Sequence, residues 1–300
     1  MNTRGSGTET SRSLGPSGGP GYGASDMPSY PPLGSYPEFS ASAGGPFPWG
    51  DGGRSSVAYN EDVLPDLVAG LQALPNLSRS GLPRKAEPRA AVLASVYVLT
   101  SSAVVNALIP LESCVIVDRQ QANRRQLQRL HDQGQSLSTL GLPGLAEVAL
   151  PSPDGSAPVI GPYGGMPEPV TLGPVRAAGW SAGKQGDHRP LLHAKMLVAG
   201  RTWVWEDDYG TERWHFTPMY TWFGSANWTA LAPSHLEFGV WSDDPALVSR
   251  NLTYLLEVLR FSQPIESTTV GPEPELVDAE WAPDEEFREA LRDLDGYEDD

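Results

Sequence analysis

The chain has 300 residues, enough for up to two domains, and its formal charge of -16 would ordinarily argue against a polyanionic partner. Its single cysteine, Cys114, excludes an intramolecular disulfide and fits a reducing compartment. The acidic excess is concentrated in residues 265–300, which hold fourteen Asp or Glu and two Arg, whereas residues 82–201 hold twelve Lys or Arg and eight acids. The overall charge therefore does not exclude a polyanionic partner for the central region.

The amino-terminal part of the chain divides into two predicted segments. Residues 1–56 are rich in Gly, Ser and Pro and have almost no aliphatic side chains. Such a segment cannot bury enough apolar area to offset the entropy lost on ordering, so a disordered arm is predicted. Residues 57–87 are predicted to form a helix and a linker, because Glu61–Leu74 carries apolar residues at helical spacing, with Asp62 as a candidate cap.

Strand and helix patterns alternate at the start of residues 88–264, which are predicted to form the folded domain. Apolar β-rich runs predict buried strands, and Thr100 or Ser101 is placed to cap a helix. This alternation favours an α/β layered domain. In chain order the predicted elements are a strand at Val92–Leu99, a helix ending near Leu108, a strand at Cys114–Val117 and a surface helix at Gln120–Gln133.

One uncharged stretch, Ala90–Leu111, is long enough to span a bilayer. Its middle is polar, with Thr-Ser-Ser at 100–102 followed by Asn106, and Pro110 interrupts its end. These residues favour a buried strand followed by a helix, and no transmembrane segment is predicted.

The rest of the chain contains a long Pro- and Gly-rich segment, several strand patterns and an acidic tail. Residues 143–186 are interpreted as a poorly ordered insert or as a lid over the nearby motif. Residues 265–300 are predicted to be an acidic tail, with one weak helix near Asp284–Leu294. The other predicted elements are a strand at Leu191–Val198, an extended β-hairpin of Thr202–Trp205 and Trp214–Phe223, a strand at Leu236–Trp241 and a helix at Pro245–Phe261.

Six tryptophans lie on or beside the predicted hairpin. Their rings are interpreted as core filling and cross-strand pairs. The alternative is that they stack on the bases of a single nucleic-acid strand. The six are Trp203, Trp205, Trp214, Trp222, Trp228 and Trp241.

A pair of short motifs predicts a phosphate site. His193 and Lys195 lie two residues apart on a predicted strand, so their side chains point to the same face. Residues 224–229, Gly-Ser-Ala-Asn-Trp-Thr, offer a hydroxyl, an amide and open backbone N–H groups that suit phosphate oxygens. An imidazole beside an ammonium and neutral donors is suited to attack on phosphorus.

In these residues the chain resembles the phospholipase D superfamily, whose motif is H-x-K, four residues, D, a short gap and then G-S-x-N. The resemblance covers roughly residues 88–262. The chain departs from the pattern at Gly200, which stands where the family has Asp, and in the long gap before the second half of the motif. The residues that match are His193, Lys195, Gly224, Ser225, Asn227 and, as the acidic residue that usually follows, Glu237.

The resemblance implies a phospholipase D-like layered α-β-α domain with a mixed sheet, and a phosphodiesterase that forms a phosphohistidine on His193. It implies that Lys195 and Asn227 contact phosphoryl oxygens and that Glu237 orients an imidazole. Gly224 and Ser225 are expected to bind substrate. No metal ion or other cofactor is implied.

The family's chemistry uses two facing H-x-K motifs, whereas this chain has one. Two copies must then meet, which predicts a homodimer with a two-fold axis through the active site. Nucleic acid is expected as substrate over phospholipid, because single-motif members are often dimeric nucleases and the core is mildly basic. A phospholipid-cleaving phospholipase D and a catalytically degenerate phosphate-binding scaffold are the alternatives.

Three further expectations concern the surroundings of the motif. His188, His215 and His235 are expected at the surface, and Asp207-Asp208 and Asp243-Asp244 in solvated turns, because they lack metal-ligand spacing. The acidic tail is a candidate binding segment for a protein partner or a nucleic-acid mimic that shields the site. A cytoplasmic location is expected, since the N-terminus has no apolar run of the secretory type.

Overall fold

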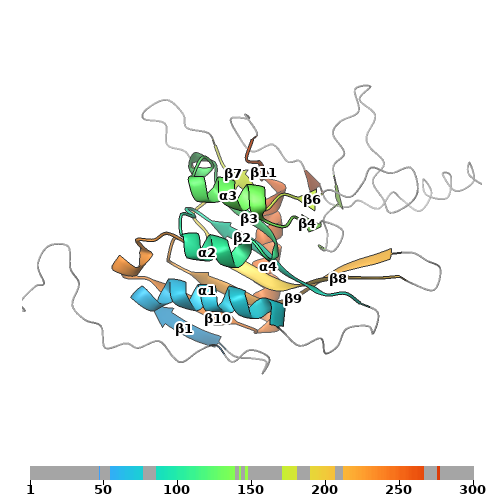
Figure 1. Ribbon diagram of the computed structural model, residues 1–300, viewed down its shortest axis with the longest axis horizontal. Coiled ribbons are helices and arrows are strands. Elements are labelled where there is room, and N and C mark those ends of the chain that lie inside the picture. Colours follow the sequence, from blue (N-terminus) through green and yellow to red (C-terminus); the bar gives the residue numbers. More distant parts are fainter. Residues whose placement is uncertain are drawn as a thin grey trace, which may run out of the picture. The chain divides into compact units, whose positions relative to one another are not determined.

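An eight-stranded sheet organises the chain, in the order β1-β10-β9-β8-β2-β3-β7-β11 (Figure 1). The computed structural model describes residues 47, 55–76, 86–138, 142, 146–147, 171–180, 190–206, 212–266 and 276–277. All of these lie in the unit Ala41–Asp300. The strands of the sheet are β1 (Ser55–Tyr59), β2 (Arg89–Val96), β3 (Glu112–Asp118), β7 (Val175–Ala178), β8 (Lys195–Glu206), β9 (Glu212–Gly224), β10 (Phe238–Ser242) and β11 (Gln263–Pro264).

The sheet is mixed, as predicted. β3 pairs in parallel with both β2 and β7, whereas the other neighbouring strands are antiparallel. A parallel pair needs a crossover connection, and α2 (Ser102–Leu108) supplies it between β2 and β3. β3 is buried along its whole length and β2 along most of it, as expected for strands that are covered on both faces.

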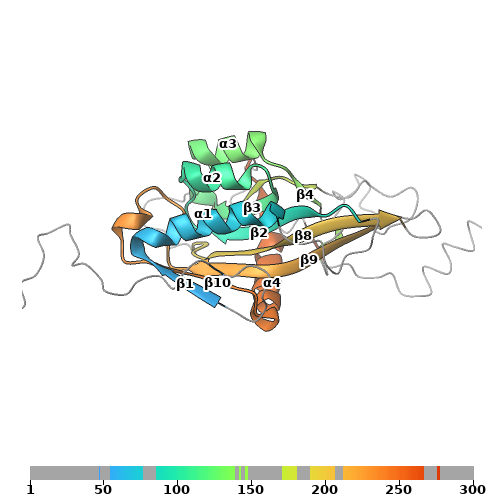
Figure 2. The ribbon, with the colours of Figure 1, turned by 60° about the horizontal axis from the view of Figure 1, so that its bottom comes forward.

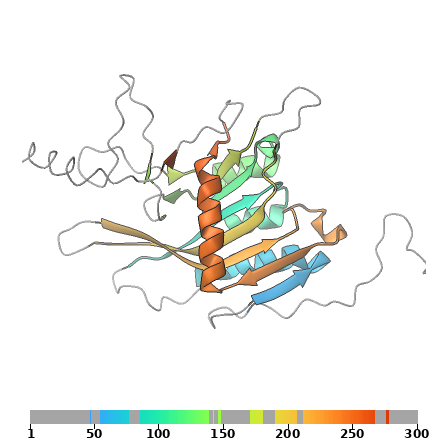
Figure 3. The ribbon, with the colours of Figure 1, turned by 180° about the vertical axis from the view of Figure 1, so that it is seen from behind.

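Helices cover both faces of the sheet, which makes the fold the layered α-β-α domain that the sequence predicted (Figure 2). α1 (Val63–Ala73), α2 and α3 (Arg125–Gln133) lie on one face. α4 (Pro245–Arg260) runs across the strands on the other face (Figure 3). Ser101 caps α2, as predicted, by accepting a hydrogen bond from the Val104 N–H.

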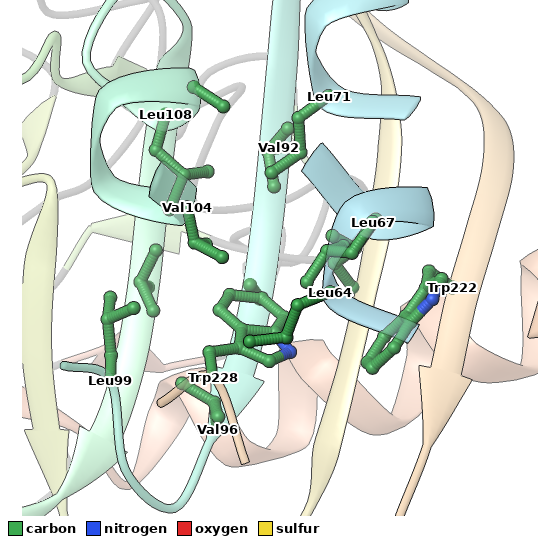
Figure 4. Packing of buried hydrophobic residues seen from close by; sticks show 14 of the residues in the cluster. Leu64, Leu67, Leu71, Val92, Val96, Leu99, Val104, Leu108, Trp222 and Trp228 are labelled. Carbon is green, nitrogen blue, oxygen red and sulfur yellow. The ribbon is translucent and has the colours of Figure 1, made fainter. Parts of the chain in front are cut away.

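Two apolar clusters form the core, one on each side of the sheet. The larger cluster joins α1 and α2 to the sheet through side chains such as Leu67, Val104 and Val92 (Figure 4). Trp222, Trp228 and Trp241 are completely buried. For these three rings, the core interpretation of the tryptophans is therefore confirmed.

The amino-terminal helix shares this core. β1 pairs antiparallel with β10, and Leu67 and Leu71 of α1 are completely buried in the larger cluster. Asp62 occupies the cap position of α1, but its side chain makes no capping hydrogen bond. The helix predicted within residues 57–87 thus belongs to the core, and β1 adds a strand that was not predicted.

β8 and β9 form the extended hairpin that the sequence predicted. β2 pairs with β8 as far as Thr202, and the β8–β9 ladder continues beyond that point. The ladder shifts register at Gly200, where an added Cβ would lie 2.1 Å from the Thr217 carbonyl oxygen and 2.9 Å from the Pro218 Cα. This close approach of two backbones accounts for a glycine at the position where the resembled family has Asp.

Replacing Gly200 with Asp, the residue of the family motif, is expected to lower the free energy of unfolding by about 3 kcal/mol. The new Cβ meets backbone atoms of β9, which cannot move aside without opening the ladder. Urea denaturation measures the change. The matched control is Gly173→Asp, because a Cβ at Gly173 meets its nearest atom at an ordinary 3.9 Å. Equal stability of the two variants would contradict the crowding at Gly200.

Other predictions are confirmed in part or concern residues outside the described ranges. The stretch Ala90–Leu111 contains β2 and α2, and among the described residues no helix is both long and apolar enough to cross a membrane. The arm at 1–56, apart from Phe47 and the start of β1, lies outside the described residues, as do most of residues 143–186 and the helix near Asp284–Leu294. The further ladders pair β4 (Leu137–Ser138) with β6 (Thr171–Leu172) and β5 (Ala146–Glu147) with β12 (Leu276–Val277).

Candidate functional site

The motif residues gather at one end of the sheet, where β2 and β9 finish and β8 and β10 begin. The register pairs Val96 of β2 with Lys195 of β8, and Gly224 of β9 with Gly239 of β10. A Cβ at Gly224 would lie 2.2 Å from the Phe238 carbonyl oxygen, so this glycine lets the two strands approach closely. The close approach gives Gly224 a role in the fold, and its expected contact with substrate stays a prediction.

His193 and Lys195 lie side by side, as their spacing indicated. The Lys195 Nζ is 3.0 Å from both Nδ1 and Nε2 of His193, and it donates to the His193 carbonyl oxygen at 2.9 Å. Because an ammonium group can only donate, a ring nitrogen that accepts from it carries a lone pair. His193 is exposed, whereas Lys195 is 7% exposed. The chain therefore presents an accessible imidazole beside a nearly buried positive charge.

Tyr97, the residue after β2, packs against this pair. Its ring centroid is 5.2 Å from that of the His193 ring and 5.9 Å from the Lys195 Nζ. Burial lowers the pKa of Lys195, and the charge of Glu237 acts in the opposite direction. A phosphoryl group bound here would add negative charge and favour the ammonium form of Lys195. Sequence reasoning missed Tyr97, although an aromatic residue at the end of an apolar strand close to a motif strand was available as a signal.

Ser225 and Glu237 are joined to each other. The Ser225 hydroxyl donates to Glu237 Oε2 and accepts at 3.1 Å from the backbone N–H that follows Glu237. Asn60 holds Glu237 from the other side, because its Oδ1 accepts the Glu237 N–H at 3.2 Å and its own N–H donates to the Glu237 carbonyl oxygen at 2.8 Å. Ser225 thereby holds the Glu237 carboxylate, and Asn60 holds the Glu237 backbone.

The carboxylate of Glu237 acts on Lys195 by charge in this chain. Among the described residues, no hydrogen bond joins Glu237 to His193, and its expected role of orienting an imidazole stays a prediction. The Ser225 hydroxyl is already engaged with Glu237, so it serves as a support for the carboxylate. Asn60 was missed from the sequence, since it lies 177 positions away from Glu237 and follows no motif spacing.

Asn227 lies beside the segment that leaves β2. The next residue, Trp228, donates its N–H to the Val98 carbonyl oxygen at 3.0 Å and accepts at 2.9 Å from the N–H groups of Thr100 and Ser101. The completely buried Trp228 ring anchors this turn in the core. The Asn227 Oδ1 is buried without a hydrogen-bond partner among the described residues. Its amide is therefore uncommitted, and an amide can turn its NH₂ group toward a ligand oxygen.

Asp118, at the end of β3, fixes the chain just before the H-x-K motif. Its Oδ2 accepts the Leu192 N–H at 2.9 Å, and its Oδ1 accepts the Gln120 N–H at 3.0 Å. The residue is 1% exposed, and burial raises the pKa of the carboxyl group despite these two hydrogen bonds, which act in the opposite direction. Asp118 is thus a positioning residue for His193. The sequence marked it as the end of a strand and gave no sign that it reaches residue 192.

Exposed apolar side chains surround the same end of the sheet. Among the described residues, seven large hydrophobic side chains are exposed, and two of them, Tyr254 and Phe261, belong to α4 or its end. The other five lie in or beside the segments that carry the motif residues, and we call them the apolar rim. The apolar rim consists of Tyr59, Leu191, Leu231, Leu236 and Phe238.

The remaining polar candidates that the structure describes do not form a metal site. The described residues contain no group of three or more His, Cys, Asp or Glu placed to hold a metal ion. His215 and His235 are exposed, as predicted, and the His215 ring stacks on Trp203 with centroids 4.1 Å apart. The expected solvated turn at Asp243-Asp244 is corrected in part, because Asp243 is buried and Asp244 caps α4. His188 and Asp207-Asp208 lie outside the described residues.

Comparisons with known proteins give likenesses of fold at low identity. No protein-family model and no curated protein matches the chain. Among solved structures, the chain is similar to NucT from Helicobacter pylori, with 14% identity and a TM-score of 0.42 over 70% of this chain and 98% of that one. It is similar to Nuc from Salmonella typhimurium, a phospholipase D family member, with 13% identity and a TM-score of 0.38 over 70% and 97%.

A third similar structure is polyphosphate kinase from Porphyromonas gingivalis, with 13% identity and a TM-score of 0.36 over 80% of this chain and 28% of that one. At these identities and TM-scores, none of the three likenesses extends to activity or to the roles of residues.

Proposed function

We propose that the chain is a phospholipase D-like phosphodiesterase that acts on nucleic acid through a phosphohistidine on His193. The observation that carries the proposal is the exposed His193 imidazole with the Lys195 ammonium 3.0 Å from its ring nitrogens. The uncommitted amide of Asn227 and the fixed carboxylate of Glu237 belong to the same end of the sheet. Together these groups supply a nucleophile, a positive charge and a neutral donor for a phosphoryl group.

The first step is attack by a ring nitrogen of His193 on the phosphorus of a bound diester. A nitrogen–phosphorus bond forms and the bond to the leaving oxygen breaks. The leaving oxygen takes a proton from a second imidazole, because an unprotonated alkoxide is a poor leaving group. Lys195 shifts from His193 to a non-bridging oxygen, where its charge stabilises the transition state.

The second step returns His193 to its starting state. The second imidazole, now neutral, takes a proton from water, and the resulting hydroxide attacks the phosphorus. The nitrogen–phosphorus bond breaks, a phosphomonoester is released and the second imidazole is protonated again. The cycle consumes one water per diester and uses no metal ion.

His193 of a second copy of the chain supplies the second imidazole in this proposal. One chain carries a single H-x-K motif, so a two-fold axis close to His193 would bring two motifs together. The apolar rim supports such a pairing, since it gathers exposed hydrophobic surface around the motif residues. A two-fold contact through this surface would bury the rim of both copies.

Phospholipid is the second candidate substrate, and the apolar rim is the observation that favours it. Exposed leucines around a phosphate site would also suit contact with a lipid surface. Nucleic acid remains the proposed substrate, because residues 82–201 carry more basic than acidic side chains.

Trapping the covalent intermediate tests the proposal. Full-length protein is quenched in alkali, where phosphohistidine survives, after brief reaction with ³²P-labelled single-stranded DNA, double-stranded DNA, RNA or a headgroup-labelled phospholipid. We expect label on His193, located by peptide mapping, with at least one nucleic acid. Label from the lipid alone would overturn the nucleic-acid assignment. Turnover without a labelled histidine, or turnover lost in EDTA, would overturn the mechanism.

A further inference from the structure

A cavity lies far from the candidate active site, at the opposite end of β2 and beside the middle of β8. It has a volume of about 420 Å³, and its walls include Leu74, Pro75, Glu87, Arg89 and Arg201. β2 and β8 pair Val96 with Lys195 near the motif and Ala90 with Arg201 at the cavity. Six residues of strand separate the two sites, a distance of about 20 Å. Volumes of this order are usual for sites that hold small molecules.

The Arg201 guanidinium is the unusual feature of this cavity. The residue is 5% exposed, yet no ion pair or side-chain hydrogen bond connects it to any other part of the described chain. Arginine does not lose its proton in proteins, so the burial of this group leaves a charge that an acid elsewhere in the chain would normally offset. Burial lowers the pKa of Arg201, and nearby Tyr220, a phenol that ordinarily carries no charge at neutral pH, acts in the opposite direction.

The other charges at the cavity do not offset Arg201. Arg89 Nη1 is 3.1 Å from Glu112 Oε1, and Thr202 Oγ1 donates to Glu112 Oε2 at 2.5 Å, so this carboxylate is committed. Glu87 is exposed and engages neither arginine among the described contacts. The Arg89 side chain is 66% exposed and keeps several N–H donors beyond the one used with Glu112. Within the described part of the chain, the cavity therefore offers one positive charge without a matching acid, and further donors from a second guanidinium.

We propose that this cavity is a second anion site, in which Arg201 binds the phosphoryl group of a small phosphorylated molecule such as a mononucleotide. A guanidinium presents paired N–H donors that match two oxygens of one phosphoryl group. A phosphomonoester carries a negative charge of about one to two units at neutral pH, which offsets the charge of Arg201. Its oxygens can also accept from the spare donors of Arg89. A carboxylate carries one charge and two oxygens and meets fewer of these donors. The site is independent of turnover at His193.

Phosphate titration of the full-length protein tests the assignment. Wild type, Arg201→Met and the matched control Arg250→Met, at an exposed arginine of α4, are titrated with inorganic phosphate, AMP and acetate. Thermal unfolding and the NMR signal of the Arg201 Nε–Hε group are recorded at each point. Met preserves the apolar stem of arginine and removes its charge.

We expect phosphate and AMP to shift the Arg201 signal and to raise the Tm of wild type and of Arg250→Met. The apparent affinity measured from Tm should fall at least about tenfold in Arg201→Met, because hydrogen bonds to a charged group are lost. Without any added anion, Arg201→Met should be no less stable than wild type, since an unmatched buried charge has been removed. An Arg201→Met variant that is no less stable than wild type without anion, but less stabilised by phosphate, separates a binding role of Arg201 from a structural one.

Three outcomes would overturn the assignment. Equal Tm shifts in wild type and Arg201→Met would place phosphate elsewhere, and acetate acting as strongly as phosphate would remove the phosphoryl preference. An Arg201 signal that phosphate leaves unmoved would show that the cavity is empty of anion. A Lys195→Met variant separates the two sites, because it should keep the shift of the Arg201 signal even if the proposal for His193 fails.

Discussion

Replacing His193 with Asn is expected to lower phosphodiester turnover by at least about a thousandfold while leaving the Tm unchanged. The proposed mechanism uses this imidazole as nucleophile in one copy and as acid and base in the other, so one substitution removes both functions. The side chain is exposed and belongs to neither core cluster, so little packing is lost. The measurement is kcat/KM on a labelled oligonucleotide, with thermal unfolding in parallel.

The matched control for this variant is His131→Asn, on α3. His131 is a partly exposed histidine whose ring nitrogens lie 3.1 Å from Asp132 Oδ1 and 2.8 Å from Glu266 Oε1 at the surface. Its loss should leave turnover within about twofold of wild type, because surface contacts between such side chains contribute little. Turnover in His193→Asn within tenfold of wild type would remove His193 from the reaction, and a large loss in both variants would point to the fold instead.

Placing charges on the apolar rim is expected to dissociate the proposed dimer and, as a result, to lower turnover. Leu231 and Leu236 are 71% and 48% exposed, so the double variant Leu231→Asp/Leu236→Asp adds two carboxylates without entering the core of the monomer. In a two-fold pairing through the rim, four such charges would face one another, and like charges in an interface cost several kcal/mol. Analytical ultracentrifugation should find a monomer, with turnover reduced at least about a hundredfold.

Tyr254 and Phe261 provide the control for the rim, because they are 45% and 48% exposed and lie on α4 or at its end. Tyr254→Asp/Phe261→Asp should remain a dimer and keep its turnover. A wild-type protein that is monomeric and active at all concentrations would contradict the dimeric site. A rim variant that stays dimeric would place the contact on another face.

Periodicity and motif spacing predicted the layers of the fold and most of its elements. Apolar β-rich runs identified β2 and β3 because these strands are covered on both faces, and the spacing of leucines identified α4. β1 was missed, since Ser55–Tyr59 is short and follows a Gly- and Ser-rich stretch. Its pairing with β10 joins positions far apart in the chain, and such pairing leaves no trace in a local pattern.

The candidate site was predictable where its residues share a short motif. His193 and Lys195 meet because a strand fixes the direction of side chains two positions apart. The supports of the site were not predictable, because Asn60 and Asp118 reach it from other elements through hydrogen bonds that follow no motif spacing. The expected role of Glu237 toward an imidazole stays a prediction, and its charge effect on Lys195 became visible only once the strands were placed.

The link between Asn60 and Glu237 limits how many residues can be removed from the amino terminus. A fragment that starts at residue 88, where the motif-bearing region was expected to begin, would lack both Asn60 and β1. It would lose both hydrogen bonds that Asn60 makes to the Glu237 backbone, and it would leave β10 as an unpaired edge strand that can pair with other chains. Truncations intended to keep the catalytic geometry should therefore begin ahead of Ser55.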